Sequence, residues 1–251
     1  MGRTLVFVNQ KGGVGKTTSA INIGAYLAAE GKRVLLVDFD SQANLTGGLG
    51  IKTKKNGVYE VLAGVVPISR AVQSSSAINL FVLPASIDLS GATVELIGKD
   101  RADFYLKEAL GLVKADYDYL LIDCPPSLGV LTINGLVAAD SVLIPMQCEY
   151  FALEGLTLLL ETIKRIQNSL NPELSVNGIF FTMYDSRTKL AQGVVKQVTS
   201  YFKDKVYATI IPRNVRLSEA PSHGLPISIY DPGCPGALAY QSLSREILQR
   251  N

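Results

Sequence analysis

The chain has 251 residues, 47% of them hydrophobic and 18% charged, with a formal net charge of +2. These values fit one globular domain over residues 1–251 with a sizeable core, and no apolar run approaches the roughly 18–20 residues that cross a bilayer. One histidine and three widely spaced cysteines argue against a histidine-based triad, a zinc site or another metal-ligand pair. We therefore expect a cytoplasmic protein with reduced, mostly buried thiols.

Residues 5–18 carry the first chemical signal. An apolar run over 5–8 leads into a turn with three glycines, and a helix is predicted to open at Thr17. Glycines let successive backbone N–H groups turn inward as a nest for an anion, and the helix N-terminus adds partial positive charge. Lys16 supplies a full charge for β- and γ-phosphates, and the Thr17 hydroxyl can ligate Mg²⁺. A purely structural turn would need neither residue. The predicted nucleotide-binding residues are Lys11, Gly12, Gly13, Val14, Gly15, Lys16, Thr17 and Thr18.

A second lysine distinguishes this loop from the usual phosphate loop. The usual form would place glycine at position 10, where this chain has Gln10, and the match is instead to the deviant form K-G-G-x-G-K-T. Lys11 thus brings a second positive charge close to Lys16. Two ammonium groups so close are unfavourable unless an anion neutralises both, which favours a triphosphate over a dinucleotide.

The rest of the chain alternates predicted strands and helices. A helix over 19–30 and a buried strand over 34–37, which presents Asp38 and Asp40 at its end, complete a right-handed βαβ unit. Residues 41–55 are polar and glycine-rich and predict a mobile loop. Further strands are predicted over 79–84, 119–123, 141–145, 176–183 and 208–212, and further helices over 89–97, 104–113, 151–170, 190–202 and 237–249. The pattern predicts an α/β fold of the P-loop type, a mostly parallel twisted sheet with helices on both faces.

Two further features point to chemistry. The strand over 119–123 ends in Asp123, about a hundred residues after the phosphate loop, and is typical of a Walker B element whose carboxylate holds Mg²⁺ directly or through water. Residues 161–216 hold 9 basic against 4 acidic side chains. Such a bias is usually a solvated face, but it can also mark a surface for a polyanion.

Five motifs form one pattern along the chain, over residues 11–18, 37–42, 123–128, 147–150 and 211–224. Together they resemble the ParA/Soj chromosome-partitioning ATPases, over nearly the whole chain. The chain departs from that family at Ser41 and Ala43, where Pro and Gly are common. It has no room for the N-terminal helix-turn-helix of many plasmid relatives, so sequence-specific operator binding is not expected.

The resemblance implies how ATP and Mg²⁺ would be held. Lys16 and the loop N–H groups would bind the phosphates, and Thr17 would bind Mg²⁺ with support from Asp123. Pro212 and Asn214 would line the adenine pocket.

The resemblance also implies the catalytic residues. Besides Lys16, these are Lys11, which would reach across a dimer interface to the partner's phosphates as an arginine finger does, and Asp40, which would orient the attacking water. For Asp38 we prefer a structural role at the strand end.

The implied function is an ATPase for chromosome or plasmid partitioning. An ATP-dependent sandwich dimer would bind double-stranded DNA without sequence preference, associate with the nucleoid, and be reset by hydrolysis that a ParB-type centromere-binding protein stimulates. The residues implied in contacts with DNA phosphates are Arg187, Lys189, Arg213 and Arg216.

Two alternatives stay open on the sequence. A MinD-like ATPase would bind membrane through a basic amphipathic C-terminal tail, but here the apolar stripe of Leu243, Ile247 and Leu248 is better explained as packing on the sheet, and no membrane partner is expected. An iron-protein-like reductase or an ATP-dependent ligase shares the fold type. A reductase would need positioned cysteines, whereas Cys124 and Cys148 lie at strand ends where neither looks free to ligate.

Overall fold

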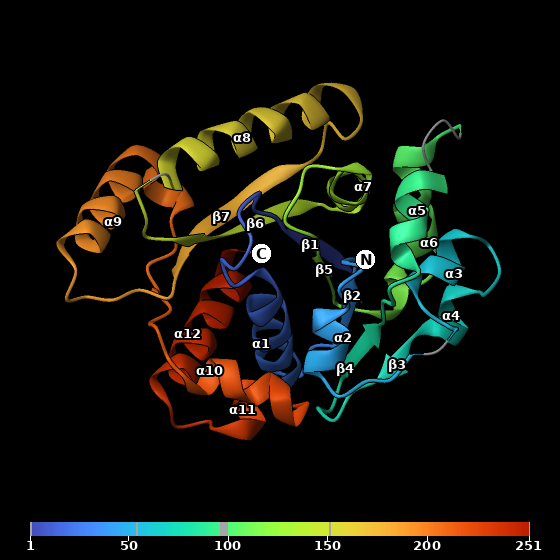
Figure 1. Ribbon diagram of the computed structural model, residues 1–251, viewed down its shortest axis with the longest axis horizontal. Helices are drawn as coiled ribbons and strands as arrows, with labels where there is room; N and C mark the ends of the chain where they lie inside the picture. The colour runs from blue at the N-terminus through green and yellow to red at the C-terminus, as the bar shows by residue number, and fades with distance from the viewer. Residues whose placement is uncertain (1, 54, 96–99, 151, 251) are drawn as a thin grey trace.

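The computed structural model describes residues 2–53, 55–95, 100–150 and 152–250. Its centre is a seven-stranded sheet in the order β3-β4-β2-β5-β1-β6-β7, parallel throughout except for the β3–β4 pair (Figure 1). The strands are β1 Arg3–Phe7, β2 Val34–Asp38, β3 Gln73–Ser74, β4 Leu80–Leu83, β5 Tyr119–Asp123, β6 Ser141–Gln147 and β7 Ser175–Thr182. This confirms the predicted α/β fold with a mostly parallel sheet.

Helices cover both faces of the sheet (Figure 1). One face packs against α1, α2 and α10 to α12, and the other against α3 to α9. The helices are α1 Lys16–Ala29, α2 Asn44–Gly48, α3 Val58–Leu62, α4 Ile68–Ala71, α5 Leu89–Glu95, α6 Tyr105–Gly111, α7 Val130–Ala138, α8 Ala152–Ser169, α9 Lys189–Phe202, α10 Arg216–Glu219, α11 Ile227–Tyr230 and α12 Pro235–Arg250.

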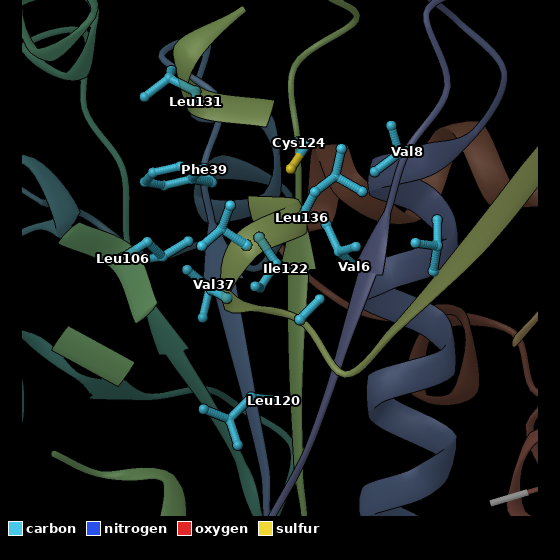
Figure 2. Packing of buried hydrophobic residues seen from close by; sticks show 14 of the residues in the cluster. Val6, Val8, Val37, Phe39, Leu106, Leu120, Ile122, Cys124, Leu131 and Leu136 are labelled. Atoms are coloured by element: carbon cyan, nitrogen blue, oxygen red, sulfur yellow. The ribbon is translucent and has the colours of Figure 1, made fainter. Parts of the chain in front are cut away.

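The apolar strands supply two cores because successive side chains point to opposite faces. Leu5 and Phe7 belong to the cluster under α1 and α12. Val6 belongs to the opposite cluster with Ile122 and Leu136 of α7, and Figure 2 shows these three side chains together. A fully buried aliphatic side chain contributes about 1.5–3 kcal/mol of hydrophobic stabilisation. Burial on both faces explains why these strands are continuous apolar runs.

The predicted strand over 208–212 is wrong. Within the described part of the chain this segment makes only a single bridge, between Tyr184 and Pro212. The backbone N–H groups of Ala208 and Thr209 donate instead to the two carboxylate oxygens of Glu246, each at 2.9 Å. These donors are therefore unavailable for a strand ladder.

The predicted mobile loop over 41–55 contains the short helix α2. Ala43 takes a left-handed conformation with φ 52° just before it, and the buried Asp38 carboxylate accepts hydrogen bonds from the N–H and hydroxyl of Thr46, at 2.8 and 2.6 Å. The sequence analysis also missed α7, because this helix is buried on nearly every side and lacks an amphipathic pattern. The predicted helix ends Ile97 and Phe151 lie outside the described residues.

The topology brings the chemically important strand ends to one edge. Phe7 pairs with Asp123, and Asp38 pairs with Asp123 on the other side, so β1, β5 and β2 end together. In a parallel sheet of this kind, ligands bind at the carboxyl ends of the strands.

Candidate nucleotide-binding site

The loop between β1 and α1 forms a concave nest of backbone donors. Gly13 and Gly15 take left-handed conformations with φ 74° and 85°, which residues with a side chain rarely adopt. Among the described residues, the N–H groups of Gly12, Gly13, Val14 and Gly15 have no protein acceptor. With α1 beginning at Lys16, this arrangement fits a bound polyphosphate.

Lys16 is held at the back of this nest. It is 6% exposed, and its ammonium donates to the carbonyl oxygens of Asn9 at 3.1 Å and Lys11 at 3.4 Å. Burial lowers the pKa of Lys16, while the negative charges of Asp123 and Asp40 act in the opposite direction. A phosphate in the nest would supply the missing counter-charge.

Asp123 offers an unusual buried carboxylate. It is 1% exposed, and neither oxygen accepts a hydrogen bond of normal geometry from the described residues. Burial and the nearby Asp38 raise the pKa of Asp123 to about 8, against the opposing effects of the Thr17 hydroxyl and Lys16. Buried charges are normally paired or coordinate a metal. Oxygen ligands beside a phosphate site suit Mg²⁺, so Asp123 and Thr17 fit the expected ion.

Asp38 has structural bonds instead. Besides its bonds to Thr46, its carboxylate accepts from the N–H of Asp40 at 3.3 Å. Burial raises the pKa of Asp38 to about 6, and the hydrogen bonds oppose that shift. These bonds are consistent with the structural role preferred for Asp38 at the strand end, and they anchor the segment that carries Asp40.

Asp40 faces the phosphate nest. It lines a cavity of about 420 Å³ together with Gly12, Lys16, Thr17 and further residues of the loop. One of its carboxylate oxygens accepts from the N–H of Gln42 at 3.0 Å, which fixes the carboxylate at the rim. A carboxylate in this place can accept a proton from, or orient, a water molecule near the terminal phosphate.

A second cavity of about 440 Å³ continues from the first. Pro212 and Asn214, which the sequence analysis expects at an adenine pocket, line it together with Leu217 and Tyr240. Four residues line both cavities, and they are Gly15, Thr18, Met183 and Pro221. The two hollows therefore form one elongated site suited to a nucleotide. The sequence analysis did not identify Met183 or Pro221.

Lys11 lies apart from both cavities. Its ammonium forms an ion pair with Glu149, in the turn between β6 and α8, and both side chains are about half exposed, at 51% and 54%. Lys11 lines neither cavity. The two lysines of the loop are thus placed differently, one inside the site and one at its outer edge.

The four residues predicted to contact DNA differ in their ion pairs. The Arg187 guanidinium donates to both carboxylate oxygens of Asp185, at 2.9 and 2.7 Å, and its side chain is 85% exposed. Arg216 is paired with Glu219 and Asp231. Lys189 opens α9 and Arg213 lines the nucleoside cavity, and neither has an ion pair within the described residues.

Two observations bear on the alternatives. Leu243 and Ile247 of α12 are fully buried and Leu248 packs beside them, so the C-terminal apolar stripe belongs to the core. Across the described ranges, no helix is long and apolar enough to cross a membrane, and no group of three or more His, Cys, Asp or Glu side chains could hold a metal ion.

Comparison with known proteins finds a matching family model and similar proteins from other organisms. A protein-family model for an AAA domain matches residues 2–176. The chain is 66% identical to the chromosome-partitioning ATPase Soj of Treponema pallidum, covering 100% of this chain and 99% of the relative, and 51% identical to the chromosome partitioning protein ParA of Caulobacter vibrioides, covering 99% and 94%.

Solved structures agree on the fold. A cobyrinic acid a,c-diamide synthase from Mycobacterium smegmatis, solved with an ATP analogue and magnesium, is 40% identical, with a TM-score of 0.86 over 99% of this chain and 95% of that one. The septum site-determining protein MinD of Pyrococcus horikoshii, in complex with Mg-ADP, is 27% identical, with a TM-score of 0.81 over 98% and 96%.

Proposed function

This chain belongs to the Soj/ParA family of chromosome-partitioning ATPases, and from that premise we propose that it is a DNA-binding switch driven by ATP. In this proposal ATP binding produces a sandwich dimer, the dimer holds double-stranded DNA on the nucleoid, and hydrolysis returns the protein to monomers. A ParB-type centromere-binding protein would stimulate that last step.

The different placement of the two loop lysines carries the proposal. Lys16 is buried in the nest, whereas the half-exposed Lys11 points outward and meets Glu149. Lys11 cannot serve the phosphates of its own site from there without leaving its partner. Its half-exposed position supports a role toward a phosphate that arrives from outside, as in an arginine finger supplied in trans.

The chemistry proposed for the site depends on few groups. The nest and Lys16 bind the phosphates, Thr17 and Asp123 hold Mg²⁺, and Asp40 orients the attacking water. Bound Mg²⁺ would supply charge neutralisation at the phosphates. Closing a second subunit over the site would also exclude bulk water, which strengthens each electrostatic contact.

DNA binding would depend on four basic side chains. Arg187, Lys189, Arg213 and Arg216 would contact phosphates, so binding would have no sequence preference. One subunit offers a modest excess of positive charge, and dimerisation places two such surfaces on one ligand. Binding would then require ATP through effective concentration.

Size-exclusion chromatography with light scattering tests the proposal. Samples with ATP, with ADP and without nucleotide are compared, each with and without a duplex of arbitrary sequence. We expect a dimer with ATP alone and co-elution of DNA with that dimer only. A monomer in every nucleotide state would refute the switch, and a dimer that ignores DNA would refute the DNA-binding part.

The MinD-like alternative of the sequence analysis is a second candidate, in which the protein binds a membrane surface. Co-sedimentation with vesicles that contain anionic lipids, in the presence of ATP, distinguishes it from DNA binding. ATP turnover that requires a carboxylic acid and an amide donor would instead favour a ligase, such as the synthase with the same fold.

A further inference from the structure

The phosphate nest presents its N–H groups inward, so some of its carbonyl groups must point outward. Two of these outward carbonyls meet side chains from a distant part of the chain. The Gln147 amide donates to the carbonyl of Gly13 at 3.0 Å, and the Thr182 hydroxyl donates to the carbonyl of Val14 at 2.8 Å. Each bond fixes the plane of a peptide unit, and hence the direction of the N–H at the start of the next residue.

The two donors are neighbours across the sheet. Gln147 ends β6 and Thr182 ends β7, and their Cα positions pair in the β6–β7 register. β6 pairs with β1 only as far as the Phe7–Leu143 partners, so the last residues of β6 and β7 extend past β1 and flank the loop. This overhang explains how the two side chains reach Gly13 and Val14.

The Thr182 contact is buried. Thr182 is 2% exposed and Val14 is 1% exposed, although Thr182 also lines the cavity of about 440 Å³. A buried carbonyl that loses its donor is costly, more so than an exposed one. The threonine methyl group also approaches the loop, because a Cβ placed on Gly15 would lie 3.7 Å from it.

Met183 extends the same contact surface. It follows Thr182 directly, takes a left-handed conformation with φ 51°, and its sulfur accepts from the Gln147 amide at 2.8 Å. Such a backbone conformation is unfavourable for a residue with a side chain and often occurs at functional sites. Met183 lines both cavities and Thr182 lines one of them, so the end of β7 contacts the site directly.

We infer that Gln147 and Thr182 are positioning residues that hold the phosphate loop in its anion-binding conformation before a nucleotide arrives. The inference rests on the proposed role of this loop in binding ATP. Without the two donors, the peptide units after Gly13 and Val14 can rotate, and the nest must be ordered at the moment of binding. Because the nest serves phosphates that ADP and ATP share, the effect is expected to be equal for both nucleotides.

The decisive variant is Thr182→Val, which keeps the shape of the side chain and removes the donor. Isothermal titration calorimetry on the full chain with Mg²⁺ measures the affinity for ADP and for ATP. We expect both to weaken about tenfold. Thr182→Ser restores the hydroxyl and is expected to stay within about twofold of the original chain. Gln147→Leu, at a partly exposed position, is expected to weaken both by about threefold.

Thr4→Val is the matched control. Thr4 is also buried, at 1% exposed, but lies near the other end of the sheet, and its hydroxyl has no hydrogen-bond partner among the described residues. Its nucleotide affinity is expected to be unchanged. Thermal unfolding without nucleotide verifies that each variant is folded at the temperature of the titration.

Three results would overturn the inference. A folded Thr182→Val protein with unchanged affinity would mean that the bond serves the fold alone. A Thr182→Ser protein as weak as Thr182→Val would assign the effect to the methyl group. A loss for ATP without a loss for ADP would place the effect at the terminal phosphate. Failure of the nucleotide site itself is distinguishable, since the unsubstituted chain would then bind neither nucleotide.

Discussion

The nucleotide edge of the sheet and the basic surface around residues 185–216 use charge in opposite ways. At the edge, Lys16 and Asp123 are buried, and the polar atoms of the Asp123 carboxylate are left without hydrogen-bond partners from the described residues. On the surface, Arg187 and Arg216 are exposed, and each already has a carboxylate partner.

The contrast shows where geometry constrains function. A buried charge without a partner is costly, so it points to a ligand. An exposed ion pair is worth only about 0–1 kcal/mol, so it neither requires a ligand nor prevents one. The buried charges of the nucleotide site therefore point to a ligand, whereas the ion pairs of the basic surface do not.

The largest effect is expected from Lys16→Ala. A buried ammonium that bonds two phosphates contributes about 3–6 kcal/mol, at about 1.5–3 kcal/mol for each charged hydrogen bond. ATP affinity is therefore expected to fall at least about 100-fold, with loss of dimerisation and DNA binding. Calorimetry provides the measurement. Retained micromolar binding in a folded Lys16→Ala protein would contradict the whole site and remove one side of the comparison.

Lys11 separates the inside of the site from its outer edge. The Lys11→Ala protein is expected to bind ATP as a monomer and to fail to dimerise, because it lacks the ammonium that we propose serves the other subunit. Light scattering at several protein concentrations measures this. A dimer of normal strength would show that Lys11 acts within its own subunit or not at all.

Glu149→Gln is the companion variant for Lys11. It removes the acid that holds the ammonium in the single subunit. Because the pair is half exposed, its loss is expected to lower the protein concentration needed for the ATP dimer by no more than about fivefold. Weaker dimerisation would instead mean that Glu149 acts within the dimer interface.

Asp40→Ala is expected to affect turnover and leave binding intact. Loss of a group that positions or deprotonates water slows a reaction by about 10²–10⁴-fold, so the ATP dimer is expected to accumulate. Phosphate release and the lifetime of the dimer are measured together. Turnover at the original rate would move the role to another residue, with Asp123 as the next candidate.

The sequence predicted the residues of local motifs but not those that distant parts of the chain bring to the site. Lys16, Thr17 and Asp123 belong to local motifs, a glycine-rich turn before a helix and an aspartate at a strand end, so the sequence located them. Gln147 and Thr182 lie more than 130 residues from the loop, and only the β6–β7 register brings them to it. Residue pairing over that distance is not encoded in a local pattern.

The incorrect and incomplete predictions have similar causes. The strand expected over 208–212 does not form, because the N–H groups of Ala208 and Thr209 donate to Glu246, 38 and 37 residues further along the chain. The ion-pair partner of Arg187 is close in the sequence, because Asp185 stands only two residues before it. Counting the basic residues of a segment ignores such ion pairs. The count therefore overstates the positive charge that is available to bind DNA.

The Arg187–Asp185 ion pair on the basic surface bears directly on DNA binding. Arg187 holds the pKa of Asp185 well below its usual range, chiefly through side-chain hydrogen bonds, so this carboxylate stays ionised at neutral pH. A DNA phosphate must then compete with Asp185 for the guanidinium. Asp185→Asn removes the competitor and is expected to tighten DNA binding by the ATP dimer by about two- to fivefold.

Arg187→Glu is expected to act in the opposite direction. It removes one phosphate contact per subunit, which should reduce the slope of log K against log salt by about 0.9 for each contact. All duplex sequences should be affected alike, and ATP-driven dimerisation should be unchanged. Fluorescence anisotropy with labelled duplexes over a salt series measures both variants.

Asp204→Asn is the control for net charge, because it removes one negative charge at a carboxylate that is not bonded to Arg187. If Asp185→Asn tightens binding no more than Asp204→Asn does, the gain is due to net charge alone. If Arg187→Glu also keeps the original salt slope, Arg187 does not touch DNA. The exposed arginines would then be ordinary surface ion pairs, and the DNA-binding surface would have to be sought among Lys189, Arg213 and the other unpaired basic residues.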